Sequence, residues 1–85
     1  MEKLMKKVGK ILTDRFKDAE IELEPLSSGT KLMGTLVWKG FSRYDQLERQ
    51  QLLADLFEKS LTREERRNIS LIMTMTPHEA MVVRE

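Results

Sequence analysis

The charged side chains that could do chemistry in this chain of 85 residues are nearly balanced, with 15 lysines and arginines against 14 aspartates and glutamates. There is no cysteine and only one histidine, His78, so a single copy can form no disulfide, thiolate metal site or histidine-rich metal site. Serines and carboxylates occur in no nucleophile elbow, phosphate-binding loop or metal-ligand spacing. We therefore expect a protein that is not an enzyme and holds no cofactor of its own.

Two groups of basic residues are the clearest candidates for contacts with a ligand. One surrounds the start of an expected helix and the other precedes an expected strand, and together they comprise Lys39, Arg43, Arg49, Arg63, Arg66 and Arg67. Such side chains can bind phosphates and release counterions, so nucleic-acid binding is one candidate function. However, the net charge is only +1, and no two glycines have the Gly-x-x-Gly spacing with which a KH module clamps a nucleic-acid backbone.

The composition is that of an ordinary folded protein, with 40% hydrophobic and 34% charged residues. A chain of this length can bury one small core, so we expect a single domain over residues 1–85. No apolar run approaches the ~20 residues of a membrane helix, and no secretory signal is recognisable. With no cysteine in the chain, a cytoplasmic protein without membrane contact is the expectation.

Hydrophobic periodicity predicts the elements that must hold these residues. Residues 2–17 have apolar side chains at helical spacing and lysines on the other face. Residues 19–24 alternate apolar and acidic side chains, which is typical of a strand with one buried face. Residues 31–39 are fairly apolar on both faces, which indicates a central strand, and turn residues Ser27-Ser28-Gly29 join the two strands into a hairpin.

Capping patterns predict the helices of the second half. Asp45-x-x-Glu48 is a capping box that begins a helix extending to about Lys59. Thr62-x-x-Glu65 is a second capping box and begins one short helical turn. The segment between the second and third expected strands is therefore helical.

A third strand is expected at residues 68–76, followed by the clearest helix start in the chain, Thr76-Pro77-His78-Glu79. Strict alternation separates Met73 and Met75 from Ile72. We expect the two methionines to fill gaps in the core, because methionine is flexible and apolar. Ile72 would then lie on the opposite face.

The predicted order is helix, strand, strand, helix, short turn, strand, helix, an α+β arrangement. A strand–helix–strand connection favours parallel, right-handed pairing, so we expect a mixed three-stranded sheet with helices packed on one face. The other face would present Met33, Val37 and Ile72 and could bind a protein partner or a second copy. Alternatively, the terminal segment Met81-Val82-Val83 could fold over that face.

Arg49 is expected within the apolar stripe of the helix that follows Asp45, whereas Gln50 and Gln51 point away from the centre of that stripe. A guanidinium in such a place needs a partner, a route to water or a functional role. The simplest interpretation is that Arg49 anchors its own helix to a backbone carbonyl or a carboxylate.

The element order, with Phe41 followed by Arg49 and a third strand running into Thr74-Met75-Thr76-Pro77-His78-Glu79, resembles the BolA family. The resemblance extends from the first helix through Glu79. It implies a small α/β module related in topology to class II KH domains. It further implies monothiol glutaredoxins as partners in iron–sulfur handling and, for some members, DNA as a ligand.

Several motif positions of that family carry other residues in this chain. The family typically has Arg-His-Arg where this chain has Arg49-Gln50-Gln51, and His-Ala-Leu where it has Asn68-Ile69-Ser70, while Pro77 and Glu79 match the motif. By the resemblance, the histidine replaced by Asn68 is an iron–sulfur ligand. Asparagine is a poor ligand for a cluster that requires thiolate or imidazole, so we expect no cluster ligation by this chain alone.

The sequence therefore predicts a BolA-like, non-catalytic interaction or regulatory module that binds another protein. A monothiol glutaredoxin is one candidate partner, and we expect a monomer or a weak homodimer. The alternative is a nucleic-acid-binding domain that uses the two groups of basic residues.

Overall fold

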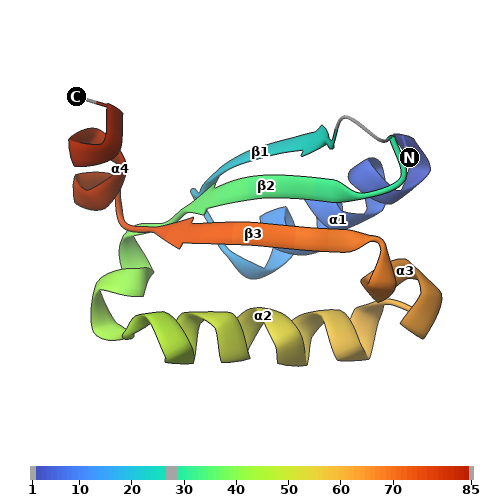
Figure 1. The fold of residues 1–85 in the computed structure, drawn as a ribbon. Coiled ribbons are helices and arrows are strands. Elements are labelled where there is room, and N and C mark those ends of the chain that lie inside the picture. Colours follow the sequence, from blue (N-terminus) through green and yellow to red (C-terminus); the bar gives the residue numbers. More distant parts are fainter. Residues whose placement is uncertain (1, 27–28, 85) are drawn as a thin grey trace.

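The computed structural model describes residues 2–26 and 29–84 (Figure 1). Within them the elements follow in the order α1 (Glu2–Arg15), β1 (Glu20–Pro25), β2 (Leu32–Val37), η1 (Lys39–Arg43), α2 (Gln46–Ser60), α3 (Arg63–Arg67), β3 (Ile69–Met75) and α4 (Pro77–Arg84). This order confirms the predicted α+β class. One element, the 3₁₀ helix η1, was not predicted. None of the helices in the described part of the chain is both long and apolar enough to cross a membrane.

The three strands form one mixed sheet with β2 at its centre. β1 and β2 are antiparallel, and β2 and β3 are parallel, as predicted from the helical connection between them. Leu26 N–H donates to Lys31 O at 2.8 Å and closes the hairpin between β1 and β2. Ser27 and Ser28 of the predicted turn lie outside the described residues.

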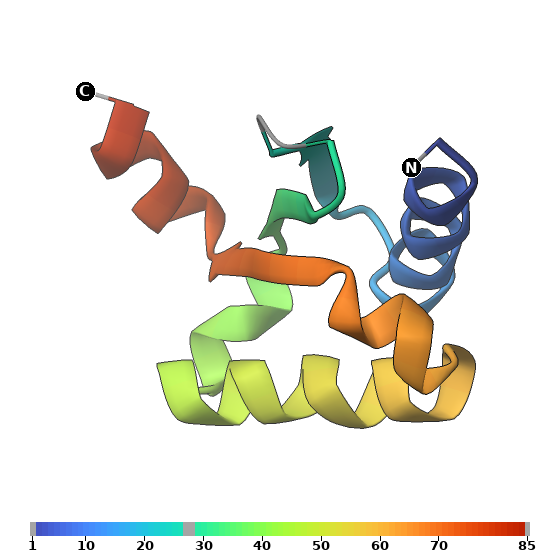
Figure 2. The same ribbon diagram turned by 45° about the vertical axis from the view of Figure 1, so that its right-hand side comes forward.

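α1 and α2 bury one face of the sheet. In Figure 1 α1 lies behind the strands and α2 runs below them, while no helix crosses the front of the strands. Side chains from both helices, from the sheet and from η1 form a single core, whose members include Val8, Leu12, Phe16, Leu32, Leu36, Phe41, Leu53, Phe57, Leu61 and Ile72. α4 stands apart from that core at the end of β3 (Figure 2).

An aromatic cluster explains why the predicted strand at residues 31–39 ends early, at Val37. Trp38 lies with its ring centroid 5.0 Å from that of Phe16 and 5.1 Å from that of Phe41, which is fully buried. The turn of η1 brings Phe41 into this cluster. The aromatic cluster includes Phe16, which directly follows α1. Local propensity along residues 31–39 therefore could not predict that the strand ends at Val37.

The face predicted for the residues of β3 is wrong. Leu32 pairs with Ile69 but the next residue, Met33, pairs with Leu71, so Ser70 is an extra residue in a β-bulge. Beyond the bulge, Ile72 is buried in the core and Met73 is 41% exposed. The register with β2 places Ile72 beside Gly34 on the covered face. The alternate set of side chains, which includes Leu71 and Met73, therefore faces outward.

Gly34 lies in β2 at a point where a side chain has no room. A Cβ atom on Gly34 would lie 2.5 Å from Glu22 O and 2.6 Å from Leu23 Cδ2. We expect Gly34→Ala to lower the free energy of unfolding by about 1–3 kcal/mol, because the crowded strand must shift. Urea unfolding followed by the fluorescence of Trp38, the only tryptophan, measures this change.

Gly9→Ala is the matched control in α1. A Cβ atom on Gly9 would lie 3.7 Å from Leu23 Cδ1, an ordinary contact. Alanine is preferred over glycine inside a helix by about 0.8–1 kcal/mol, so this variant should be more stable than the wild type. Equal effects of the two substitutions would contradict the close approach at Gly34.

Candidate functional site

Arg49 joins four segments of the chain through one buried guanidinium. The residue is only 5% exposed. Its Nε atom donates to Phe41 O at 3.2 Å and to Tyr44 O at 3.0 Å. Its Nη1 atom donates to Thr74 O at 3.4 Å and to Glu79 Oε1 at 2.7 Å. The structure thus shows the anchoring role that the position of Arg49 in the apolar stripe indicated.

Glu79 has two roles at the start of α4. Its Oε1 atom accepts from Arg49 Nη1 and also from the Thr76 backbone N–H at 2.7 Å, while Glu79 N–H donates to Thr76 Oγ1 at 3.2 Å. The helix cap predicted from sequence is therefore also the partner of the buried arginine. Hydrogen bonds from the Arg49 guanidinium and from the Thr76 N–H hold the pKa of the Glu79 carboxyl below its ordinary value.

Two glutamines of α2 cover the outer edge of β3, which no other strand pairs with in the described sheet. Gln50 Nε2 donates to Ile72 O at 3.3 Å, and Gln46 Nε2 donates to Thr74 O at 3.3 Å. Gln50 is exposed, away from the centre of the buried stripe as predicted, yet its amide group reaches the edge of β3. Gln51 does point away and donates to Asp55. The i, i+4 spacing of Gln46 and Gln50 was a signal that the sequence analysis missed.

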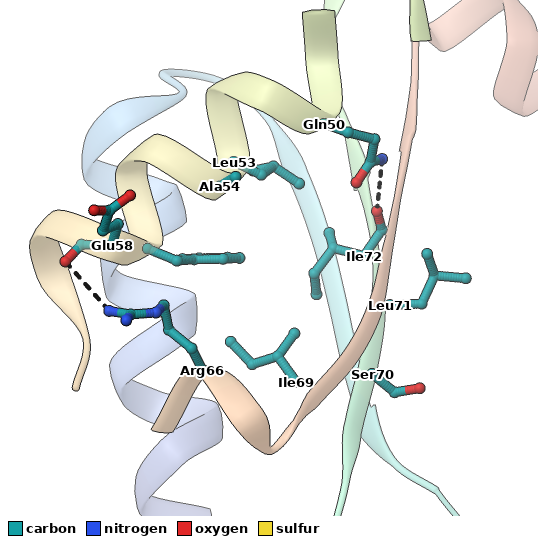
Figure 3. A pocket seen from close by; sticks show the side chains of 10 residues that line it. Gln50, Leu53, Ala54, Glu58, Arg66, Ile69, Ser70, Leu71 and Ile72 are labelled. Carbon is teal, nitrogen blue, oxygen red and sulfur yellow. Dashed lines mark hydrogen bonds between the residues drawn. The ribbon is translucent and has the colours of Figure 1, made fainter. Parts of the chain in front are cut away.

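A hollow of about 370 Å³ lies between α2, α3 and β3 (Figure 3). Its apolar wall includes Leu53, Ile69 and Ile72, and Gln50 lies at one end. Arg66 lies at the other end, where its Nη1 donates to Glu58 O at 3.4 Å and to Leu61 O at 2.8 Å. Both polar ends of the hollow are therefore bonded to the protein's own backbone.

The basic residues predicted to bind a ligand lie at opposite ends of α2. Lys39 and Arg43 belong to η1, before the helix, and the arginines at 63, 66 and 67 belong to α3, after it. The 15 residues of α2 span about 22 Å. Arg49 and Arg66 donate to backbone carbonyls of the protein itself. The structure does not bring the two groups into one patch.

Asn68 caps the C-terminus of α3, and its carbonyl accepts from Leu32 N–H at 2.8 Å. The hollow around it is lined by Lys3, Leu4, Lys7, Thr62, Glu64, Glu65 and Asn68. None of these supplies the thiolate or imidazole that an iron–sulfur cluster requires. His78 lies beyond the other end of β3, which at seven residues is about 23 Å long. The residues at this position therefore do not fit such a cluster.

No three metal-ligating side chains lie close enough to hold a metal ion anywhere in residues 2–26 and 29–84.

The face of the sheet opposite α1 and α2 is here called the open face, and Leu71 and Met73 are exposed on it. It is formed by the outward residues of the strands, which are Glu20, Glu22 and Glu24 of β1, Met33, Thr35 and Val37 of β2, and Leu71, Met73 and Met75 of β3. Six large apolar side chains are exposed in the described part of the chain: Leu71 and Met73 on this face, Met81, Val82 and Val83 on α4, and Leu47 on α2.

The expectation that Ile72 lies on the open face was wrong, and the alternative that the terminal segment covers this face does not hold either. Leu71 and Met73, rather than Ile72, give it apolar character beside Met33. The segment Met81-Val82-Val83 does not fold over it, since these three side chains are 57–67% exposed. α4 instead leans away from the sheet (Figure 2), because Glu79 and Ala80 rather than the last turn hold it to the domain.

Comparison with solved structures finds the same architecture in the BolA domain of SufE1 from Arabidopsis thaliana. The superposition has a TM-score of 0.69 and covers 93% of this chain and 96% of that chain, at 22% sequence identity. This chain has a BolA-like fold. No protein-family model and no curated protein matches its sequence. The resemblance noted from Arg49 and the Thr76-Pro77 helix start is thus confirmed at the level of fold.

Arg49→Met should destabilise this BolA-like domain by about 2–3 kcal/mol. The methionine side chain has similar length, but it leaves the carbonyls of Phe41, Tyr44 and Thr74 without this donor. Urea unfolding measures the loss. Arg43→Met, at an exposed position of η1, is the control and should change stability by no more than about 0.5 kcal/mol. Equal losses in both variants would contradict the anchoring role.

The lowered pKa of Glu79 predicts acid sensitivity. Because its pKa is lower in the folded state than in the unfolded state, its contribution to stability is complete above its ordinary pKa of 4.5 and is lost as the pH falls through the lowered value. Glu79→Gln has no charge to lose at this position. Its melting temperature should therefore fall less than that of the wild type between about pH 5 and pH 3. Parallel melting curves would contradict this assignment.

Proposed function

We propose that this chain is a cytoplasmic, non-catalytic interaction module that binds another protein through its open face. The observation that carries the proposal is the exposure of Leu71 and Met73 on the open face, with exposed Met81 of α4 near Val37 at one end of that face. A contiguous apolar patch on a folded domain is typical of a protein–protein contact. The BolA-like fold supports the comparison with a family of interaction modules, and a monothiol glutaredoxin is one candidate partner.

The arrangement of charge favours a protein over a nucleic acid as the ligand. The open face carries three glutamates, which repel phosphates. The arginines at 49 and 66 are committed to backbone carbonyls, and the remaining basic residues are divided between the two ends of α2. A phosphate backbone would therefore meet no single basic surface built from these residues.

Site-specific photo-crosslinking tests this function in cells of the organism from which the gene comes. p-Benzoylphenylalanine at Met73 should yield an adduct with another protein on irradiation, because position 73 lies on the open face. The same group at Gln51, which is exposed on the outer side of α2, is the control and should yield little adduct. An adduct at twice the 10.0 kDa chain mass would instead indicate a second copy. Equal adducts at both positions, or none at either, would contradict the proposal.

A further inference from the structure

The open face carries its charge along one edge and its apolar surface along the other. β1 contributes three exposed glutamates, and β3 contributes two exposed apolar side chains. The strand register aligns these residues across the sheet in the rows Glu24, Met33, Leu71 and Glu22, Thr35, Met73. Neighbouring strands lie about 4.8 Å apart, so the acidic column runs parallel to the apolar column at a distance of about 10 Å.

α4 extends this surface at one end. The third row, Glu20, Val37, Met75, leads to a hollow of about 250 Å³ in which Val37 lies with Ala80 and Met81. Val37 and Ala80 are buried, whereas Met81 is 61% exposed. The charged side chains that line the hollow are Asp18, Glu20 and Lys39. The apolar column therefore continues onto α4, and the acidic edge remains net negative at this end.

The dimensions of the open face match those of an α-helix. A six-residue strand is about 20 Å long, which equals about 13 residues of helix, and the three strands are about 10 Å wide, close to the diameter of a helix with its side chains. Glutamates two residues apart on β1 repeat every ~6.7 Å, close to the ~6 Å between helical residues i and i+4. A helix lying along the strands could therefore place one basic flank over Glu22 and Glu24.

A second copy of this chain fits the open face poorly. In a dimer with its twofold axis parallel to the strands, each β1 would lie on the β3 of the other copy and bury carboxylates against Leu71 and Met73. With the axis across the strands, each β1 would lie on the β1 of the other copy, and glutamate would face glutamate. Both arrangements would press carboxylates against apolar side chains or against other carboxylates, which is costly.

We propose that the element that docks on the open face is an amphipathic helix of another protein, with an apolar stripe for β2, β3 and α4 and a flank of lysine or arginine for β1. This inference rests on the proposed function and specifies the chemistry of the partner. The apolar stripe supplies most of the binding free energy, and the basic flank sets the orientation of the helix and excludes acidic competitors.

Synthetic peptides test the charge preference directly. The probe is a fluorescein-labelled 18-residue helix with a leucine stripe and lysines along one flank, and the matched probe has glutamate in place of each lysine. Fluorescence anisotropy should show at least about tenfold tighter binding of the lysine peptide, with an affinity that falls as salt is added. A scrambled lysine peptide of identical composition should bind no better than the glutamate peptide.

Variants of the protein locate the site. The double variant Glu22→Lys, Glu24→Lys should weaken binding of the lysine peptide about tenfold and strengthen binding of the glutamate peptide. Met73→Ser should weaken both. The control Glu58→Lys, Glu64→Lys makes the same change of net charge on α2 and α3 and should leave both affinities within about twofold. All of these residues are exposed, and melting temperatures check that each variant is folded.

The outcomes separate this inference from the proposed function. Equal binding of lysine and glutamate peptides, abolished in both cases by Met73→Ser, would overturn the charge preference and leave the docking surface intact. Binding of the scrambled peptide as tightly as the lysine peptide would also overturn the inference, because charge alone would then suffice. Failure of every peptide to bind, together with a crosslinked adduct at position 73, would overturn this inference. The open face would then bind a protein by an element other than a basic amphipathic helix. Absence of the adduct would remove the proposed function itself.

Discussion

The buried guanidinium of Arg49 is the constraint on which the arrangement of the second half of the chain depends. It holds the carbonyls of Phe41 and Tyr44 before α2, the carbonyl of Thr74 in β3, and the carboxylate that caps α4. A guanidinium has its donors in one rigid plane, so a single side chain can set the relative positions of these segments. Because Glu79 is also the capping residue of α4, the direction in which that helix leaves the sheet is coupled to the same contact.

The sheet has two faces with different roles because α1 and α2 pack along one face, whereas α4 meets the other only at its Val37 end in the described part of the chain. α1 and α2 bury the face that carries Leu32, Leu36 and Ile72, and that burial supplies the core. α4, held by its first turn, leaves Leu71 and Met73 on the other face exposed. The glutamates of β1 are therefore next to an apolar surface without being buried in it, and the open face has both charge and hydrophobic area.

Much of the fold followed from short-range patterns. The three capping boxes, beginning at Asp45, Thr62 and Thr76, are contacts between residues three apart, so they are visible in the sequence and form as predicted. The β-bulge at Ser70 and the turn of η1 were missed because each involves a partner distant in the chain, which is β2 for the bulge and Phe16 for Phe41 of η1. The same reason explains why Met73 was assigned to the core: alternation defines two sets of side chains but not which set faces the helices.

The sequence by itself determined the order of elements, the mixed sheet and the unusual position of Arg49 within an apolar stripe, because these follow from periodicity, capping and the handedness of a strand–helix–strand connection. Only the tertiary structure decided which face of β3 is exposed, that Gln46 and Gln50 cover its edge, and that Leu71 and Met73 share an exposed face with the glutamates of β1. These features arise from the register between strands and from contacts between segments 20 or more residues apart, and such contacts leave no local pattern in the chain.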